Sequence, residues 1–212
     1  MTSTDLKISA VLQAAGSASR MGFRPKCLIE VDGIPLIVKK IQALQNAGVQ
    51  DIVVVLGHYA KEIEPLIQHL NIHIVQNPNP DQGQISSQRL GLQHISNDSN
   101  TVIMALADQP LIQEHDISHI ITEYQNRPKG IEWVYPMIDR QPGNPVIFSI
   151  TVATSILSKE DTYGCRDWRN QNSEAVHGVL SANQHYVLDI DTPNDLIKIS
   201  QQTGHLFSWP VQ

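Results

Sequence analysis

The stretch "ISAVLQAAGSASRMGFRPK", residues 8–26, sets the architecture of this chain. Residues 8–14 are mostly apolar and include β-branched side chains, which is typical of a short buried strand. Gly16 ends that run, and the loop after it combines glycines, serines and cations. In an open α/β sheet, the loops after the carboxyl ends of the strands border the ligand crevice. The stretch therefore predicts a strand that carries a flexible cationic loop into a crevice.

The rest of the chain alternates between strand-like and helix-like segments. Strands are predicted at 51–57, 72–76, 101–107, 132–137 and 145–150, and within 186–196, where a strand runs into a helix started by proline. Helical spacing is found at 35–47, 59–70, 85–95 and 112–124. This alternation predicts an α/β fold with a three-layer α/β/α architecture around a mainly parallel, Rossmann-like sheet.

Length and charge limit the classes of protein to consider. A chain of 212 residues is expected to form a single domain over 1–212, with the less regular part at 139–186 forming one wall of a cleft. Its 15 basic and 21 acidic residues give a net charge of −6, which argues against nucleic acid or an anionic membrane as a partner. The polar start, the two separated cysteines and the lack of a long apolar run favour a cytoplasmic protein.

The loop at 14–26 has the chemistry of a polyphosphate cradle. Gly16 and Gly22 allow a tight turn, Ser17 can donate a hydrogen bond, and Arg20 and Lys26 can neutralise phosphate charge. The spacing matches neither the P-loop of ATPases nor the dinucleotide fingerprint. A plain polar connection between a strand and a helix is the alternative.

Several motifs, in order along the chain, resemble one enzyme family. AAGSASRMG with the later lysine is similar to the signature loop of nucleotidyltransferases. DQGQISSQRLGL at 81–92, ALADQP at 105–110, GNPVIF at 143–148 and DIDTPNDL at 189–196 resemble segments of the molybdenum cofactor cytidylyltransferases, which are MobA-like. The resemblance implies the fold of the nucleotide-diphospho-sugar transferases. The Pro25–Lys26 pair also resembles the corresponding segment of the methylerythritol cytidylyltransferases. Asn144 stands at a position where the molybdenum cofactor cytidylyltransferases usually have histidine.

The resemblance implies a role for each matching residue. Lys26 would contact the α- and β-phosphates, Arg20 the departing pyrophosphate, and Asp108 would complete the catalytic set. The nucleotide would be bound by Ala15, Gly16, Ser17, Gly22, Lys26, Gly83, Ser86 and Ser87, and the acceptor by Gly143, Asn144 and Pro145. The two serines near residue 85 could equally cap the helix expected there.

Nucleotidyl transfer brings two anions together, which favours a divalent cation held by oxygen ligands. Asp108 follows a buried strand directly, so its carboxylate is expected at the crevice. We assign Asp108 and Asp191 to Mg²⁺, with Asp189 as the alternative to Asp191. Each aspartate could instead cap a helix, and the family resemblance is what favours the metal.

The function expected from these patterns is transfer of CMP from CTP to a phosphorylated acceptor, molybdopterin, with release of pyrophosphate. One alternative keeps the reaction with another NTP or with a sugar or polyol phosphate. A second is a non-catalytic regulator that binds nucleotide. An acceptor enzyme that takes up the product is a further expected partner.

Other chemistry-bearing residues are assigned to the surface or the core. His115 and His119 stand at helical i, i+4 spacing with Asp116 between them, but no third ligand is evident, so a solvated helix surface is expected. Cys27 is expected to pack in the core, and Arg24 to be a solvated charge.

Overall fold

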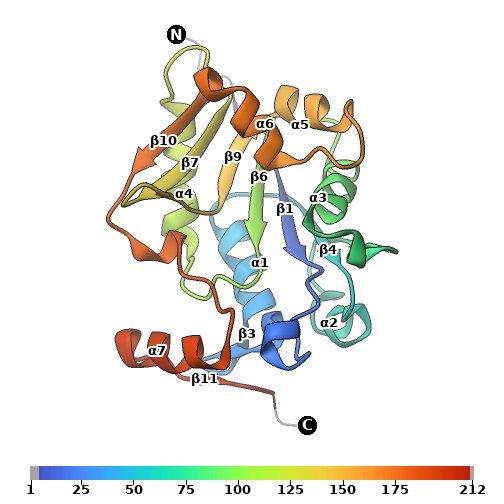
Figure 1. Ribbon diagram of the computed structural model, residues 1–212, viewed down its shortest axis with the longest axis vertical. Helices are drawn as coiled ribbons and strands as arrows, with labels where there is room; N and C mark the ends of the chain where they lie inside the picture. The colour runs from blue at the N-terminus through green and yellow to red at the C-terminus, as the bar shows by residue number, and fades with distance from the viewer. Residues whose placement is uncertain (1–4, 211–212) are drawn as a thin grey trace.

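The computed structural model describes residues 5–210, and a mixed sheet lies at its centre (Figure 1). The strands of this sheet run in the order β10-β7-β9-β6-β1-β4-β5, and β8 pairs with β7. Their bounds are Ile8–Ala14 (β1), Asp51–Leu56 (β4), His73–Gln76 (β5), Thr101–Leu106 (β6), Trp133–Ile138 (β7), Gln141–Pro142 (β8), Val146–Ser149 (β9) and Val176–Leu180 (β10). The pairs β1–β4, β1–β6, β4–β5 and β7–β10 are parallel, whereas β9 is antiparallel to both neighbours.

Helices cover both faces of the sheet, as the predicted α/β/α layering requires. The α-helices are Leu36–Asn46 (α1), Ala60–Ile67 (α2), Gln84–Leu92 (α3), Glu114–Gln125 (α4), Ile150–Leu157 (α5), Cys165–Gln171 (α6) and Pro193–Thr203 (α7). Short 3-10 helices lie at Ser19–Met21, Lys26–Leu28, Pro80–Gln82, Ser173–Ala175 and Gln184–Tyr186. The three-layer fold and the mainly parallel sheet are confirmed.

The two cores follow from the period of two along each strand. In β1, Leu12 joins the cluster beneath α1, α2 and α4, while its neighbour Val11 joins the cluster beneath α3, α5 and α6. In β4, Val54 and Val53 divide in the same way. Both faces of these strands are buried, which explains their nearly continuous apolar sequences.

A small second sheet lies beside the end of the main sheet to which β1 and β6 point (Figure 1). It consists of Glu30–Val31 (β2), Ile34–Pro35 (β3) and Phe207–Ser208 (β11), in the order β11-β2-β3. A third apolar cluster, which includes Met21, Ile190 and Ile199, joins this sheet to α7 and to the loop after β1. The C-terminal part of the chain is thereby packed against the loop that carries Lys26.

The order of the strands places a switch point beside β1. The chain passes from β1 to β4 and β5 on one side and then returns to β6 on the other side of β1. Because the connection after β1 leads to β4 on one side of this strand pair and the connection after β6 leads to β7 on the other, a crevice opens beyond their carboxyl ends. The cationic loop follows β1 and Asp108 follows β6, so both lie at this crevice.

The prediction of a strand at the start of 186–196 is wrong. Residues 187–191 form no strand, although α7 does begin at Pro193 with Thr192 as its N-cap. Both edges of β6 are already paired, with β1 and with β9, so no edge is open to this segment there. Its contact with the segment after β6 is a hydrogen bond in which Ile190 donates its N–H to the carbonyl of Asp108 at 3.1 Å. The prediction of a single domain over 1–212 stays a prediction.

Candidate active site

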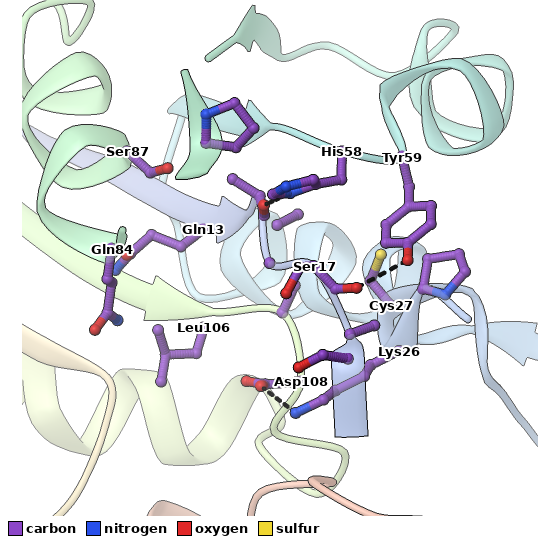
Figure 2. A pocket seen from close by; sticks show the side chains of 18 of the residues that line it. Gln13, Ser17, Lys26, Cys27, His58, Tyr59, Gln84, Ser87, Leu106 and Asp108 are labelled. Carbon is purple, nitrogen blue, oxygen red and sulfur yellow. Dashed lines mark hydrogen bonds and ion pairs between the residues drawn. The ribbon is translucent and has the colours of Figure 1, made fainter. Parts of the chain in front are cut away.

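A cavity of about 490 Å³ lies at the switch point, between the loop after β1 and the segments that follow β4, β5 and β6 (Figure 2). Its lining includes most of the residues predicted to bind nucleotide or phosphate: Ala15, Gly16, Ser17, Arg20, Lys26, Gly83, Ser87 and Asp108. Gly22, Ser86 and Asp191 are not among its lining residues. Gly22 has a φ of 65°, in the left-handed region, and ends the short helix Ser19–Met21.

Lys26 joins the three segments that carry the predicted catalytic groups. Its Nζ lies 2.6 Å from Asp191 Oδ1 and 3.5 Å from Asp108 Oδ2, and its side chain is only 15% exposed. Arg20 Nη1 lies 2.8 Å from the other oxygen of Asp191. Two carboxylates from distant parts of the chain thus meet one ammonium group at the rim of the cavity. This arrangement has opposite charges in close, partly buried contact, where they interact more strongly than in water.

A third carboxyl group, Asp189, belongs to the same region. Although the residue is exposed, protein packed around its carboxyl raises its pKa to about 6, and the charge of Asp108 adds to that effect. Asp191, rather than Asp189, makes the short contacts with Lys26 and Arg20. The sequence left a choice between Asp189 and Asp191 as the second metal ligand. The structure places Asp191 against Lys26 and Arg20, and the assignment of the metal to it stays a prediction.

Residues after β4 hold the opposite side of the loop. Tyr59 donates its hydroxyl to the carbonyl of Ser17 at 2.8 Å, and His58 Nδ1 lies 3.1 Å from the carbonyl oxygen of Ala15. His58 Nε2 lies 2.9 Å from a carboxylate oxygen of Asp81. A carbonyl and a carboxylate can only accept, so the protonated imidazole can donate to both of them at once, which favours its charged form. The hydrogen bond to Asp81 accordingly raises the pKa of His58.

The sequence reasoning missed His58 and Tyr59. The signal was present, because the two residues follow the buried run at 51–57, where a parallel strand ends at the crevice. Gly57, just before these two residues, lets the chain after β4 lie close to Ala15. A Cβ atom there would lie 2.5 Å from the carbonyl oxygen of Ala15, so only glycine allows this close approach.

A buried asparagine organises the two serines of α3. Asn77 Nδ2 lies 2.9 Å from the hydroxyl oxygens of both Ser86 and Ser87. Ser86 also donates to the carbonyl of Gly83 at 2.8 Å, within the first turn of the helix, whereas Ser87 faces the cavity. Of the two serines, Ser87 is therefore the one in position to meet a ligand, and neither caps α3, whose N-cap is Gly83 without a side-chain hydrogen bond.

The floor of the cavity contains a polar atom without a partner. Gln13 of β1 lines the cavity, and its side-chain Oε1 is buried with no hydrogen bond to any residue in the described range 5–210. Buried polar groups are normally paired, so this amide is a candidate for contact with a ligand or water.

The predicted acceptor residues lie away from the cavity lining. The backbone of Gly143 lies against Tyr186, because a Cβ at Gly143 would lie 2.6 Å from the carbonyl oxygen of Tyr186. Asn144 donates its N–H to that same oxygen at 2.9 Å, and the Asn144–Pro145 bond is cis. Their assignment to the acceptor stays a prediction.

Two residues outside the predicted site are also placed by the structure. Burial raises the pKa of Cys27 to about 12, so its thiol is not activated, in agreement with the expected packing role. Arg24, in contrast, does not extend freely into solvent. Its guanidinium lies 3.9 Å from the ring centre of Trp209, which ties the loop to the C-terminal segment.

An open α/β sheet with a cationic glycine-containing loop and acidic side chains at its switch point defines a nucleotide-binding class of α/β protein. The comparison with known families is more specific. The chain belongs to the family of the MobA-like NTP transferase domain, which matches residues 10–176.

Relatives and solved structures agree with this assignment. The bifunctional protein GlmU of Syntrophomonas wolfei is 30% identical over 130 residues, which are 58% of this chain and 27% of that protein. The chain thus spans little more than a quarter of that curated relative. A nucleotidyl transferase from Methanothermobacter thermautotrophicus superposes with a TM-score of 0.75 at 23% identity, over 92% of this chain and 97% of the other. The 4-diphosphocytidyl-2C-methyl-D-erythritol synthase from Anaerococcus prevotii has a TM-score of 0.70 at 16% identity, over 94% and 99%. These structural likenesses establish the shared fold.

Among residues 5–210, no helix has the length and apolar character needed to cross a bilayer.

Proposed function

We propose that the protein transfers CMP from CTP to a phosphorylated acceptor and releases pyrophosphate, with molybdopterin as the favoured acceptor. The single observation that carries this proposal is the meeting of Lys26, Asp108 and Asp191 at the mouth of a cavity. In such a transfer an anion attacks the α-phosphorus of another anion, so positioning and charge neutralisation account for most of the catalysis.

The donor set fits a hard divalent cation. Asp108 and Asp191 offer carboxylate oxygens, which Mg²⁺ prefers, and both carboxylates are already drawn to the same point by the Lys26 ammonium. We assign Mg²⁺ to these two residues, with Asp189 close to them. When bound, Mg²⁺ supplies positive charge to the phosphate oxygens and stabilises the charge that develops on the leaving group.

Lys26 and Arg20 have a second task in this mechanism. Before nucleotide binds, they neutralise Asp108 and Asp191 through the ion pairs described above. With a triphosphate in the cavity, their charges are available to the phosphates, Lys26 from its sheltered position and Arg20 from the exposed rim. Arg20 and Lys26 then hold the pyrophosphate as it departs, while the acceptor phosphate donates the attacking oxygen.

The nucleoside is assigned to the side of the cavity lined by Ala15, Gly83 and Ser87. The unpaired amide of Gln13 is an acceptor for an exocyclic amino group, which cytosine provides. Adenine also carries such a group, so this contact favours CTP over UTP but not over ATP. The preference for CTP also rests on the resemblance of the loop to pyrimidine-using enzymes.

The acceptor is assigned to the side formed by Gly143, Asn144 and Pro145. This side lies beside the segment 186–191, which we call the strap. Another NTP, or a sugar or polyol phosphate as acceptor, would use the same catalytic groups. A non-catalytic nucleotide-binding regulator is disfavoured, because this chain keeps the lysine and both carboxylates. The cytoplasmic location and the acceptor enzyme for the product stay predictions.

The decisive experiment measures pyrophosphate release from each of the four NTPs with Mg²⁺ and a panel of phosphorylated acceptors that includes molybdopterin. We expect release only when an acceptor is present, with CTP and molybdopterin giving the highest rate. Release with a sugar or polyol phosphate but not with molybdopterin would show that the acceptor is of that other class. No release with any combination of NTP and acceptor would contradict the enzymatic function.

A further inference from the structure

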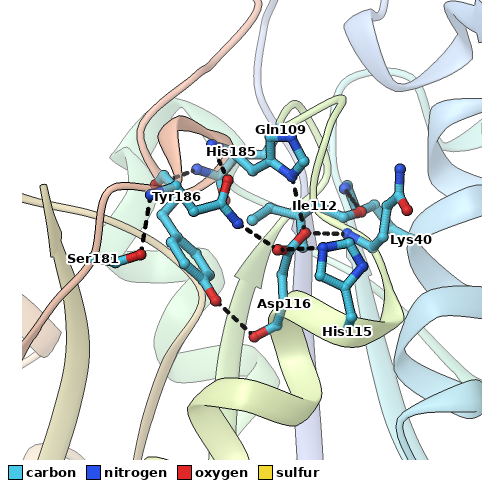
Figure 3. Close-up of polar contacts among 10 residues, drawn as sticks. Lys40, Gln109, Ile112, His115, Asp116, Ser181, His185 and Tyr186 are labelled. Carbon is cyan, nitrogen blue, oxygen red and sulfur yellow. Dashed lines mark hydrogen bonds and ion pairs between the residues drawn. The ribbon is translucent and has the colours of Figure 1, made fainter.

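A second polar cluster lies outside the cavity lining, where the start of α4 meets the turn at 183–186 (Figure 3). Its centre is Asp116, whose side chain is fully buried. His115 Nε2 lies 3.0 Å from Asp116 Oδ1, and His185 Nδ1 lies 3.2 Å from Asp116 Oδ2. His185 comes from a segment 69 residues further along the chain, so this third ligand cannot be seen in the local sequence pattern.

The carboxylate of Asp116 is already fixed in orientation by other donors. The backbone N–H of Gln113 donates to Oδ2 at 2.8 Å, and Asn183 Nδ2 donates to Oδ1 at 2.6 Å. Each carboxylate oxygen has two lone-pair sites, so each keeps one site that faces a histidine. Supporting hydrogen bonds of this kind orient the ligands of protein metal sites.

The charge of the cluster also favours a cation. A carboxylate held away from water needs a positive partner. The nearest buried amine, Lys40, donates to the carbonyl of Ile112 at 2.6 Å, and burial lowers its pKa to about 7. The charge of Asp116 acts in the opposite sense and raises that pKa.

The contacts of the two histidines with Asp116 have hydrogen-bond lengths, and the cluster is also compact enough for the three side chains to share one metal ion. The ligand atoms of His115, Asp116 and His185 lie within 4.8 Å of one another. In a tetrahedral Zn²⁺ site, with ligands at about 2.1 Å, neighbouring ligand atoms lie about 3.4 Å apart. Each histidine nitrogen lies near that distance from one of the two carboxylate oxygens of Asp116, at 3.0 Å from Oδ1 and at 3.2 Å from Oδ2.

We propose that His115, Asp116 and His185 form a binding site for one divalent transition-metal ion of the Zn²⁺ type. Two imidazoles and one carboxylate are ligands that Zn²⁺ prefers, whereas Mg²⁺ prefers an all-oxygen set. The side chain of His115 is 66% exposed, which leaves a path for the ion and room for a water ligand.

The ion would join α4 to the strap, which leads to Asp191 in the candidate active site. Tyr186, next to His185, donates its hydroxyl to the carbonyl of Asp116 at 3.0 Å, and its own carbonyl accepts from Gln109 at 3.0 Å. Five residues beyond Tyr186 lies Asp191. A metal at the cluster therefore fixes the strap that brings Asp191 to Lys26. The proposal does not depend on the nucleotidyl transfer, because it concerns different side chains.

The test is titration of the full chain, freed of metal by a chelator, with Co²⁺ and Zn²⁺. We expect one equivalent of Co²⁺ to give the visible absorption of a nitrogen-ligated ion, and Zn²⁺ to displace it and raise the melting temperature. His115→Ala and His185→Ala should each weaken this binding by at least about 10-fold. Because His115 is exposed, its variant is expected to fold even if the His185 variant does not.

The matched control is His119→Ala, on the same helix, whose ring faces Glu123 at 3.9 Å rather than the cluster. It should bind Co²⁺ like the unchanged protein, and so should Asp108→Asn, which affects only the other site. Absence of saturable Co²⁺ absorption in the unchanged protein would overturn the proposal. Binding that survived both cluster variants, or that was lost in Asp108→Asn, would overturn it as well.

Discussion

Lys26 Nζ lies 2.6 Å from Asp191 Oδ1, although 165 residues separate the two along the chain. The contact joins the loop after β1, which lines the cavity, to the segment before α7. It also keeps two anionic side chains, Asp108 and Asp191, together before any cation or nucleotide arrives.

Asp108→Asn should lower turnover by about 10³-fold or more while the fold persists, because the amide removes the charge assigned to Mg²⁺. The measurement is pyrophosphate release with CTP and acceptor, together with the circular dichroism spectrum. Asp98→Asn, a change of the same type at an exposed position, is the control and should keep full activity. Near-normal turnover of the Asp108 variant would rule out its assignment.

Lys26→Gln should reduce kcat/KM by about 10²-fold, because a sheltered cation that faces the phosphates is lost. It should also lower the melting temperature in the absence of Mg²⁺, since Asp108 and Asp191 would then repel each other, and Mg²⁺ should restore more stability to the variant than to the unchanged protein. Lys61→Gln, on the exposed side of α2, should alter neither quantity. Equal responses to Mg²⁺ in the variant and the unchanged protein would argue against a shared carboxylate site.

CTP should raise the melting temperature more than ATP, GTP or UTP when all are compared at one concentration with Mg²⁺, because at a given concentration a ligand that binds the folded state more tightly stabilises it more. Gln13→Leu should reduce the difference between CTP and UTP, since the acceptor for the amino group is removed. A larger shift with GTP or ATP would overturn the choice of base.

The affinity for CTP should fall as the pH rises through the raised pKa of His58. The charged imidazole joins Ala15 to Asp81, and a group whose pKa is raised on folding stabilises the folded arrangement below its unfolded pKa of about 6.5. The stabilisation is then lost as the pH passes the folded value. Because Asp81 is 91% exposed, the change in Kd should be no more than about fivefold.

The control for this effect is His58→Gln, which cannot carry the charge and should bind CTP weakly across the range. CTP itself titrates at similar pH, so the Kd of the variant is divided by the Kd of the unchanged protein at each pH. This ratio is followed between pH 5.5 and 8.5, about one to two units on either side of the unfolded pKa of histidine. A constant ratio would show that the His58 charge has no part in binding.

Much of the fold could be predicted because the core strands are apolar on both faces. Strands β1, β4 and β6 and helices α1 and α4 follow directly from apolar runs and helical spacing. The segment 187–191 is also predicted as a strand, yet it is not one, because pairing depends on an open sheet edge rather than on composition. Likewise, nothing in the local pattern of Arg24 indicates that Trp209 lies beneath it.

The order of residues along the chain was enough to identify the cationic loop, the carboxylate that follows β6 and the type of ligand they suit, because side-chain chemistry and strand ends are local properties. The pairing of Lys26 with Asp191, the bridge made by His58 and the cluster of His115, Asp116 and His185 needed the folded chain. Each joins residues that no short-range period relates, and only the packing of the sheet, its helices and the C-terminal strap sets their distances.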